Sequence, residues 1–219
     1  MPDSLVQEAA AGSLIWFSAG TSRCEPAEAQ ANPWPVKLGS CTLRVNGRPM
    51  PLGSISISPV ALSNIVFEPI YRVVAQLPYD LDRSTATVEI EDKNGRTNAL
   101  SLTIKPVVPV LASPIGSGPV IPYVRKPGEE VVVRLTGLGV TSTPAPWGDV
   151  AESSMQVVAP VEAFVGGRTA RILGAELSRT EVGVFEVRFE VPSIASDLHI
   201  LNLRVVGTDV PLGSHFVTR

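Results

Sequence analysis

The chain has little of what most enzymes use for catalysis. Only two histidines and two cysteines occur among its 219 residues. His199 and His215 each lie in an apparent strand, with no cysteine or carboxylate at the spacing that a metal site or a nucleophile and its base require. We therefore predict ordinary strand side chains at both positions, a protein without metal or cofactor, and no enzymatic activity.

Charge of one sign and long apolar runs are also missing. Lys and Arg number 18 and Asp and Glu 21, interspersed along the chain, for a net charge of −3. This balance argues against a nucleic-acid partner. The longest apolar run, near 106–111, is interrupted by prolines and falls well short of the ~20 residues that cross a bilayer. We expect no transmembrane segment.

The first eight residues lack the basic start, apolar centre and small-residue cleavage site of a signal peptide. The sequence therefore leaves two readings open. Either the protein is cytoplasmic, or the chain is the trimmed form of an exported protein.

What the sequence does contain is a repeat. The segment 43–52 is echoed by 163–173, and three pairs of landmarks agree on the spacing: Gly12 and Gly128 lie 116 residues apart, Gly47 and Gly167 lie 120 apart, and Pro78 and Pro192 lie 114 apart. A repeat of this length is a domain rather than a turn of a solenoid. We predict domains over 1–106 and 120–219, joined by a Pro/Gly-rich linker over 107–119.

The composition of both copies favours strands. Hydrophobic residues make up 44% of the chain and charged ones 18%, and 20 Pro and 18 Gly mark turns. Apolar and polar residues alternate, and Asn46-Gly47 and Gly166-Gly167 are hairpin signals at matching places. About seven short strands per copy predict an all-β chain of two tandem immunoglobulin-like β-sandwiches. A closed barrel fits the pattern less well.

Cys24 and Cys41 are the only cysteines, and they flank a Pro/Ala-rich loop. We expect a disulfide between them, because the ends of this loop would otherwise be poorly tied; two separate thiols are the alternative. On the chain-entropy model such a bridge constrains the unfolded chain by roughly 3 kcal/mol. The pair is not the inter-sheet bridge of antibody domains, since the two cysteines are too close in sequence.

Several ordered motifs resemble a known family. They are Gly-Ser-Leu-Ile from residue 12 and the runs 35–47, 75–81, 135–139, 165–167 and 182–192. Together they look like the tandem C-terminal module of large secreted acidobacterial proteins, which is uncharacterised and itself similar to IPT/TIG immunoglobulin-like domains. The resemblance covers nearly the whole chain. It implies an immunoglobulin-like fold and a secreted or cell-surface setting, and it implies no chemistry.

Tryptophans are the strongest candidates for binding a ligand. Trp34 and Trp147 occupy matching Pro-rich loops of the two copies, where they are either exposed for stacking on sugar rings or folded over a sandwich end to cover core. Trp16 lies within a strand, and we expect it in the core. Asp80 and Asp82 follow Pro78 without forming a defined calcium loop, so solvated charge is the simpler interpretation.

The sequence thus favours a non-enzymatic structural, adhesion or protein-interaction module of an exported bacterial protein, with an unknown protein or polysaccharide as partner. One alternative is a carbohydrate-binding module that uses Trp34 and Trp147. A weaker alternative is a two-domain assembly chaperone, which would need an exposed edge strand and a basic cleft.

Overall fold

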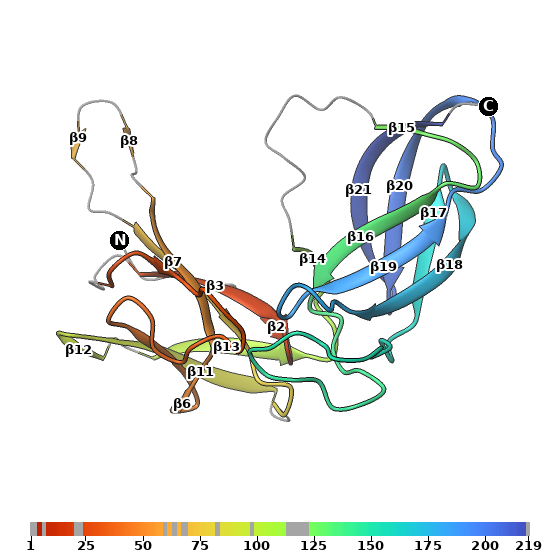
Figure 1. The fold of residues 1–219 in the computed structure, drawn as a ribbon. Coiled ribbons are helices and arrows are strands. Elements are labelled where there is room, and N and C mark those ends of the chain that lie inside the picture. Colours follow the sequence, from red (N-terminus) through yellow and green to blue (C-terminus); the bar gives the residue numbers. More distant parts are fainter. Residues whose placement is uncertain are drawn as a thin grey trace.

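The computed structural model describes residues 4–5, 8–19, 24–58, 61–62, 65–66, 70–81, 84–96, 99–112 and 123–217. Over these ranges every regular element is a β-strand, arranged as two layered domains (Figure 1). No helix of the described part is long and apolar enough to span a membrane.

The N-terminal domain consists of two antiparallel layers with one parallel pair. The first layer has the order β1 (Ser4–Leu5), β3 (Leu14–Ala19), β10 (Ile70–Gln76), β7 (Leu52–Ser58), β4 (Ala27–Glu28). The second has the order β2 (Glu8–Ala10), β13 (Leu100–Lys105), β11 (Thr85–Asp92), β5 (Thr42–Val45), β6 (Arg48–Pro49), with β12 (Gly95–Arg96) paired to β11. A separate short pair is formed by β8 (Ala61–Leu62) and β9 (Ile65–Val66).

The C-terminal domain repeats this plan in one continuous ladder. Its order is β14 (Val110–Leu111), β16 (Glu130–Thr136), β19 (Phe185–Glu190), β18 (Arg168–Leu177), β17 (Val161–Val165), β20 (Asp197–Val205), β21 (Thr208–Val217), β15 (Tyr123–Arg125). The long strand β18 serves both layers, because its first part pairs with β17 and the rest with β19. In the N-terminal domain, Met50 and Pro51 divide the corresponding strand into β6 and β7.

The topology of both copies is immunoglobulin-like. In each, the first strand is split between the layers: β1 and β14 run antiparallel to β3 and β16, whereas β2 and β15 run parallel to the last strands, β13 and β21. The remaining strands distribute between the layers as in the two sheets of an immunoglobulin sandwich. The predicted fold class is confirmed.

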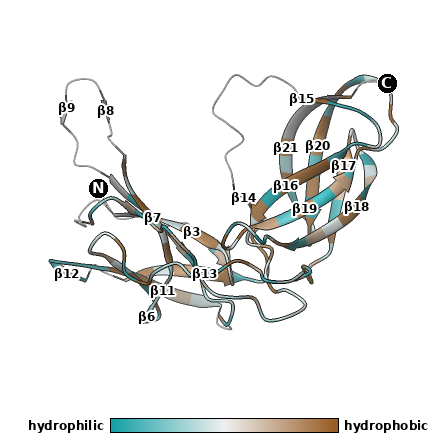
Figure 2. Ribbon diagram, in the orientation of Figure 1, coloured by the Kyte–Doolittle hydropathy of each residue, from teal (hydrophilic) through white to brown (hydrophobic). Residues whose placement is uncertain are grey.

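Alternation along the strands builds one core in each domain. In β3, Ile15 and Phe17 are buried in the N-terminal core, and in β16 Val131 and Val133 are buried in the C-terminal one. Figure 2 shows hydrophobic residues concentrated on the strands of both domains. The prediction of a core Trp16 is wrong. Both alternating sets of β3 are apolar, and the pleat turns Trp16 to the outer face, where it is half-buried.

The repeat extends to a β-bulge. The register between β10 and β7 shifts so that Gly53 is an extra residue, and the register between β19 and β18 shifts so that Leu173 is the extra one. Both bulges thus fall at equivalent positions of the two copies. Such a bulge bends its strand and increases the local twist.

Part of the segment expected as a linker contributes to the C-terminal sandwich. Val110–Leu111 form β14 and pair with β16, and Val107 packs against the C-terminal core. Residues 113–119 lie outside the described part of the chain. We propose that the second domain begins near Val107, which leaves little free chain between the two sandwiches.

Candidate functional site at the seam between the domains

The two domains meet in a contact that we call the seam, and Gln76 is at its centre. The side chain of Gln76, at the end of β10, has no exposed surface. Its Nε2 donates to the carbonyl oxygen of Gly12 (3.4 Å) and to the hydroxyl of Tyr79 (3.2 Å), while its Oε1 accepts from the N–H of Gly148 (2.6 Å). Its carbonyl oxygen accepts from Nε1 of Trp147 (3.0 Å). This buried amide is therefore hydrogen-bonded to both domains.

Two aromatic side chains are exchanged across the seam. Tyr79 belongs to the N-terminal domain and packs against the C-terminal core, whereas Trp147 belongs to the C-terminal domain and packs against the N-terminal core. The loop that carries Trp147, after β16, extends from its own domain to the other one (Figure 1). Burial raises the pKa of the Tyr79 phenol, and the hydrogen bond from Gln76 opposes that shift only in part.

A glycine permits the domains to approach closely. A β-carbon on Gly183 would lie 2.8 Å from Cδ2 of Leu14 and 3.1 Å from Nε2 of Gln76. Gly183 also has a φ of +67°, which a side chain disfavours. Beside this contact the N–H of Leu14 donates to Oγ1 of Thr136 at 2.8 Å. Close packing at Gly183 and a hydrogen bond to Thr136 thus join the two domains beside Gln76.

The loop of Trp34 reaches the same place. Its indole lies on Gly53, whose β-carbon, if present, would be 2.6–2.9 Å from the ring atoms. The N–H of Trp34 donates to the carbonyl oxygen of Gly148 at 2.6 Å. The two Pro-rich loops therefore touch, and each carries its tryptophan half-buried against the N-terminal domain.

The expected disulfide joins Cys24 and Cys41, with their Cα atoms 5.4 Å apart. Both cysteines are buried in the N-terminal core. The bridge closes the loop that carries Trp34. It therefore ties together the two ends of the segment that contacts Gly148 at the seam.

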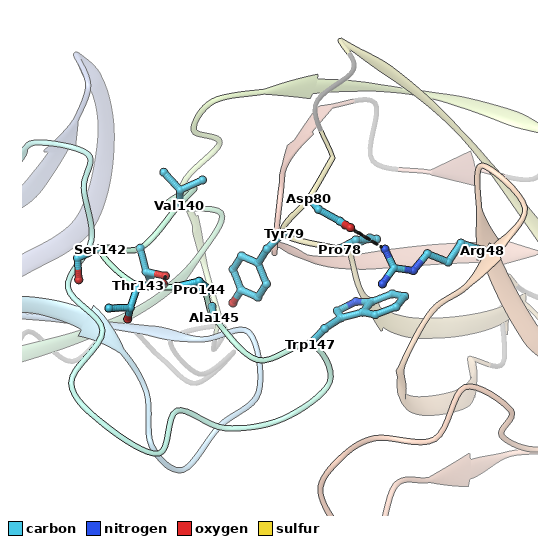
Figure 3. A pocket seen from close by; sticks show the side chains of 11 residues that line it. Arg48, Pro78, Tyr79, Asp80, Val140, Ser142, Thr143, Pro144, Ala145 and Trp147 are labelled. Carbon is cyan, nitrogen blue, oxygen red and sulfur yellow. Dashed lines mark hydrogen bonds and ion pairs between the residues drawn. The ribbon is translucent and has the colours of Figure 1, made fainter.

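A hollow of about 520 Å³ opens at the seam (Figure 3). Arg48 and Asp80 form an exposed ion pair at its rim, with Nη1 at 3.0 and 2.9 Å from the two carboxylate oxygens. The guanidinium of Arg48 also lies 4.0 Å from the ring centroid of Trp147, a cation–π distance. The other lining residues are Pro78, Tyr79, Val140, Thr141, Ser142, Thr143, Pro144 and Ala145.

The hollow offers aromatic and proline rings with hydroxyl groups, and its charges neutralise each other. One face and the N–H of Trp147 are already in use, by Arg48 and Gln76. Trp34 is not among the lining residues. The two tryptophans that the sequence singled out therefore do not form a joint platform in this hollow.

His199 is not among the residues that line the hollow. His199 lies on β20, and its ring Nε2 is 2.9 Å from the carbonyl oxygen of Ala195. The side chain of His215 and the whole of Asp82 lie outside what the structure describes. Over the described ranges, no three His, Cys, Asp or Glu side chains gather in a way that could hold a metal ion.

Comparisons with known proteins concern architecture. No protein-family model matches the chain, and no curated protein matches its sequence. Among solved structures, it is similar to SGBP-B of the Bacteroides ovatus mixed-linkage glucan utilization locus, in complex with a mixed-linkage heptasaccharide: 9% identity, TM-score 0.36, 97% of this chain and 44% of that one.

Two further similar structures are an Escherichia coli adhesin and a domain of intimin. The Escherichia coli adhesin FdeC shares 12% identity over 100% of this chain and 64% of that chain, with a TM-score of 0.29. The D00-D0 domain of intimin shares 12% identity over 100% of both chains, with a TM-score of 0.28. The chain thus spans less than two thirds of the first and second of these three. At such identities and TM-scores, the similarities carry no information on what this chain binds.

Proposed function

We propose that the chain is a non-enzymatic, two-domain structural or adhesion unit of an exported protein, which presents its surfaces to a partner in one fixed relative orientation. The observation that carries this proposal is the seam. Domains within one chain usually move relative to each other unless their interface is large and apolar. Here, opening the seam would expose Tyr79 and Trp147 and break the hydrogen bond from the N–H of Gly148 to the buried Oε1 of Gln76.

An extracytoplasmic setting is part of the proposal. Its support is the buried bond between Cys24 and Cys41, since disulfides form and persist in oxidising compartments and are rare in the cytosol. Its further support is the resemblance to modules of secreted bacterial proteins. The partner on this interpretation is a protein or a polysaccharide outside the cell.

Small-angle X-ray scattering of the full chain tests the fixed orientation. We expect a scattering profile that one two-domain conformation reproduces, unchanged between low and high salt. A double variant, Gln76→Ala with Trp147→Ala, should give a broader distribution of interdomain distances. A profile of the unaltered chain that only a wide ensemble fits would contradict the proposal.

A second candidate function, carbohydrate binding, is favoured by the hollow at the seam. Its rim combines Tyr79, Trp147 and the hydroxyl groups of Ser142 and Thr143 without net charge, which suits a neutral sugar. A glycan array tests this candidate. We expect binding that is lost in Thr143→Val and retained in Thr169→Val, an exposed threonine on β18; an array without neutral binders would remove the candidate.

A further inference from the structure

The outer face of the first layer of the N-terminal domain carries a second tryptophan site. Trp16, Val74 and Ser54 are register partners across β3, β10 and β7, and Arg72 is opposite Ser56 in the next row. We call these five residues the Trp16 face. Their neighbours along the strands, Ile15, Val73 and Ile55, are buried in the core, so all five side chains are directed away from it.

The equivalent face of the C-terminal domain is closed by its own charges. There Arg134 pairs with Glu186 at 3.6 Å, Arg171 with Glu190 at 2.5 Å, and Arg188 with Glu176. The register places Val132, Arg188 and Gly174 where the first copy has Trp16, Val74 and Ser54. A ladder of ion pairs across one sheet is a solvated surface with its charges satisfied.

The Trp16 face has no such ladder among the described residues. Its one carboxylate in these rows is Glu28, which the register places opposite Ser54 at the edge of the layer, and no ion pair joins it to Arg72. Arg72 is exposed, and among the described residues no carboxylate lies within ion-pair distance of it. Its counterpart in the second copy is Glu186, which is paired. Among the described residues, the first copy therefore presents an arginine without an ion-pair partner at the position where the second copy has the paired Glu186.

Trp16 and Arg72 are close enough to act together. Trp16 is opposite Val74 and Arg72 is opposite Ser18, which makes Trp16 and Arg72 diagonal neighbours on adjacent strands. Such neighbours are about 7–8 Å apart at the backbone, within reach of an aromatic ring and a long side chain. The face also continues from the seam, because Leu14 and Gln76 lie next along the same two strands and contact the C-terminal domain.

The small apolar area and the exposed arginine of this face indicate which class of partner fits it. A stable protein interface buries about 800 Å² on each side around an apolar centre, and Trp16 and Val74, both half-buried, offer little apolar area. A sugar ring needs less apolar contact area than a protein partner does, because the C–H face of one ring packs on one indole. A carboxylate one bond from that ring would reach the guanidinium and make a charge-assisted hydrogen bond.

We propose that the Trp16 face binds an acidic polysaccharide, with a hexuronate ring on Trp16, its carboxylate on Arg72 and its hydroxyl groups on Ser54 and Ser56. This site goes beyond the proposed function, since it uses none of the seam residues. Loss of the site would leave the scattering profile of the full chain unchanged.

Isothermal titration calorimetry of the full chain with an oligogalacturonate, and with the same oligomer as its methyl ester, tests the proposal. The ester keeps the rings and removes the charge. We expect the acid to bind at least about tenfold more tightly than the ester, as for the loss of one hydrogen bond to a charged group. Binding of the acid should also weaken as salt is raised.

Variants taken from the second copy provide the controls. Arg72→Gln should weaken binding of the acid by about tenfold and leave binding of the ester unchanged. Trp16→Val, which introduces the residue of the equivalent position, should abolish binding of both while circular dichroism reports a folded chain. Arg171→Gln, on the charged face of the second copy, should change nothing. Absence of binding, equal affinity for acid and ester, or tighter binding of an acidic peptide than of the glycan would each overturn the proposal.

Discussion

The indole N–H of Trp147 donates to the carbonyl oxygen of Gln76 at 3.0 Å, from one domain to the other. The side chain of the same glutamine holds the next residue of that loop, because its Oε1 accepts from the N–H of Gly148. Two successive residues in a loop of the C-terminal domain are thus bound by one residue at the end of a strand in the N-terminal domain. The stability of the two domains should therefore be coupled.

Replacing Gln76 by Ala is expected to lower the free energy of unfolding by about 1–3 kcal/mol, the cost of leaving a buried donor such as the N–H of Gly148 unsatisfied. The bond from Trp147 would persist, since it ends on the backbone. Urea denaturation followed by circular dichroism and by tryptophan fluorescence measures the change. Gln156→Ala, at an exposed glutamine, is the control and should have little effect.

Gly183→Ala is expected to destabilise the protein more than Gly167→Ala does. Both glycines have positive φ, +67° and +77°, so both variants strain the backbone. Only the β-carbon at residue 183 would meet Leu14 and Gln76, whereas nothing lies within 4 Å of the one at residue 167. Thermal unfolding of the two variants separates the steric cost at residue 183 from the backbone strain that both variants share. Equal losses of stability would show that the seam tolerates a methyl group.

Stability should fall as the pH rises above about 10, because unfolded tyrosines release their proton near that pH while burial raises the pKa of Tyr79 in the folded protein. The folded state then holds a proton that the unfolded state loses, so alkali favours unfolding. Urea midpoints measured between pH 8 and 11 should show this dependence. Tyr79→Phe should reduce it, and a slope as steep in that variant as in the unaltered chain would contradict the assignment.

Val206→Asn is expected to stabilise the protein by about 1 kcal/mol, because a branched residue is strained in the left-handed region and asparagine is tolerated there. Val206 has a φ of 49° in the turn between β20 and β21, and it is 56% exposed, so the change removes little packing. The thermal midpoint measures the effect. Val158→Asn replaces another exposed valine, whose φ is not positive, and should give no stabilisation.

Much of the fold was predictable from the sequence because turns and alternation are local. Asn46-Gly47 and Gly166-Gly167 form the turns that their φ preferences indicate, with φ between 49° and 79°. The Trp16 error came from the same signal: in Leu14-Ile-Trp-Phe17 both faces are apolar, so alternation alone does not tell which one is buried.

The seam was beyond sequence reasoning for a different reason. Gln76 was part of an alternating strand, and nothing local marks it as the residue to which a loop some 70 positions later returns. Arg72 likewise stands out only when it is compared with Glu186, and the strand register is needed to identify Glu186 as its counterpart. The matched loops of Trp34 and Trp147 were the best available sign of a special region, and both loops do meet at the seam.

In each domain the first and last strands run parallel and side by side, as Tyr123–Arg125 do with residues 215–217. Tension applied to the two ends of such a domain pulls these neighbours in opposite directions along their length. The hydrogen bonds between them are then loaded together, in shear, rather than opened one after another. We expect a domain built in this way to resist extension along its length, a property that the proposed adhesion role would require.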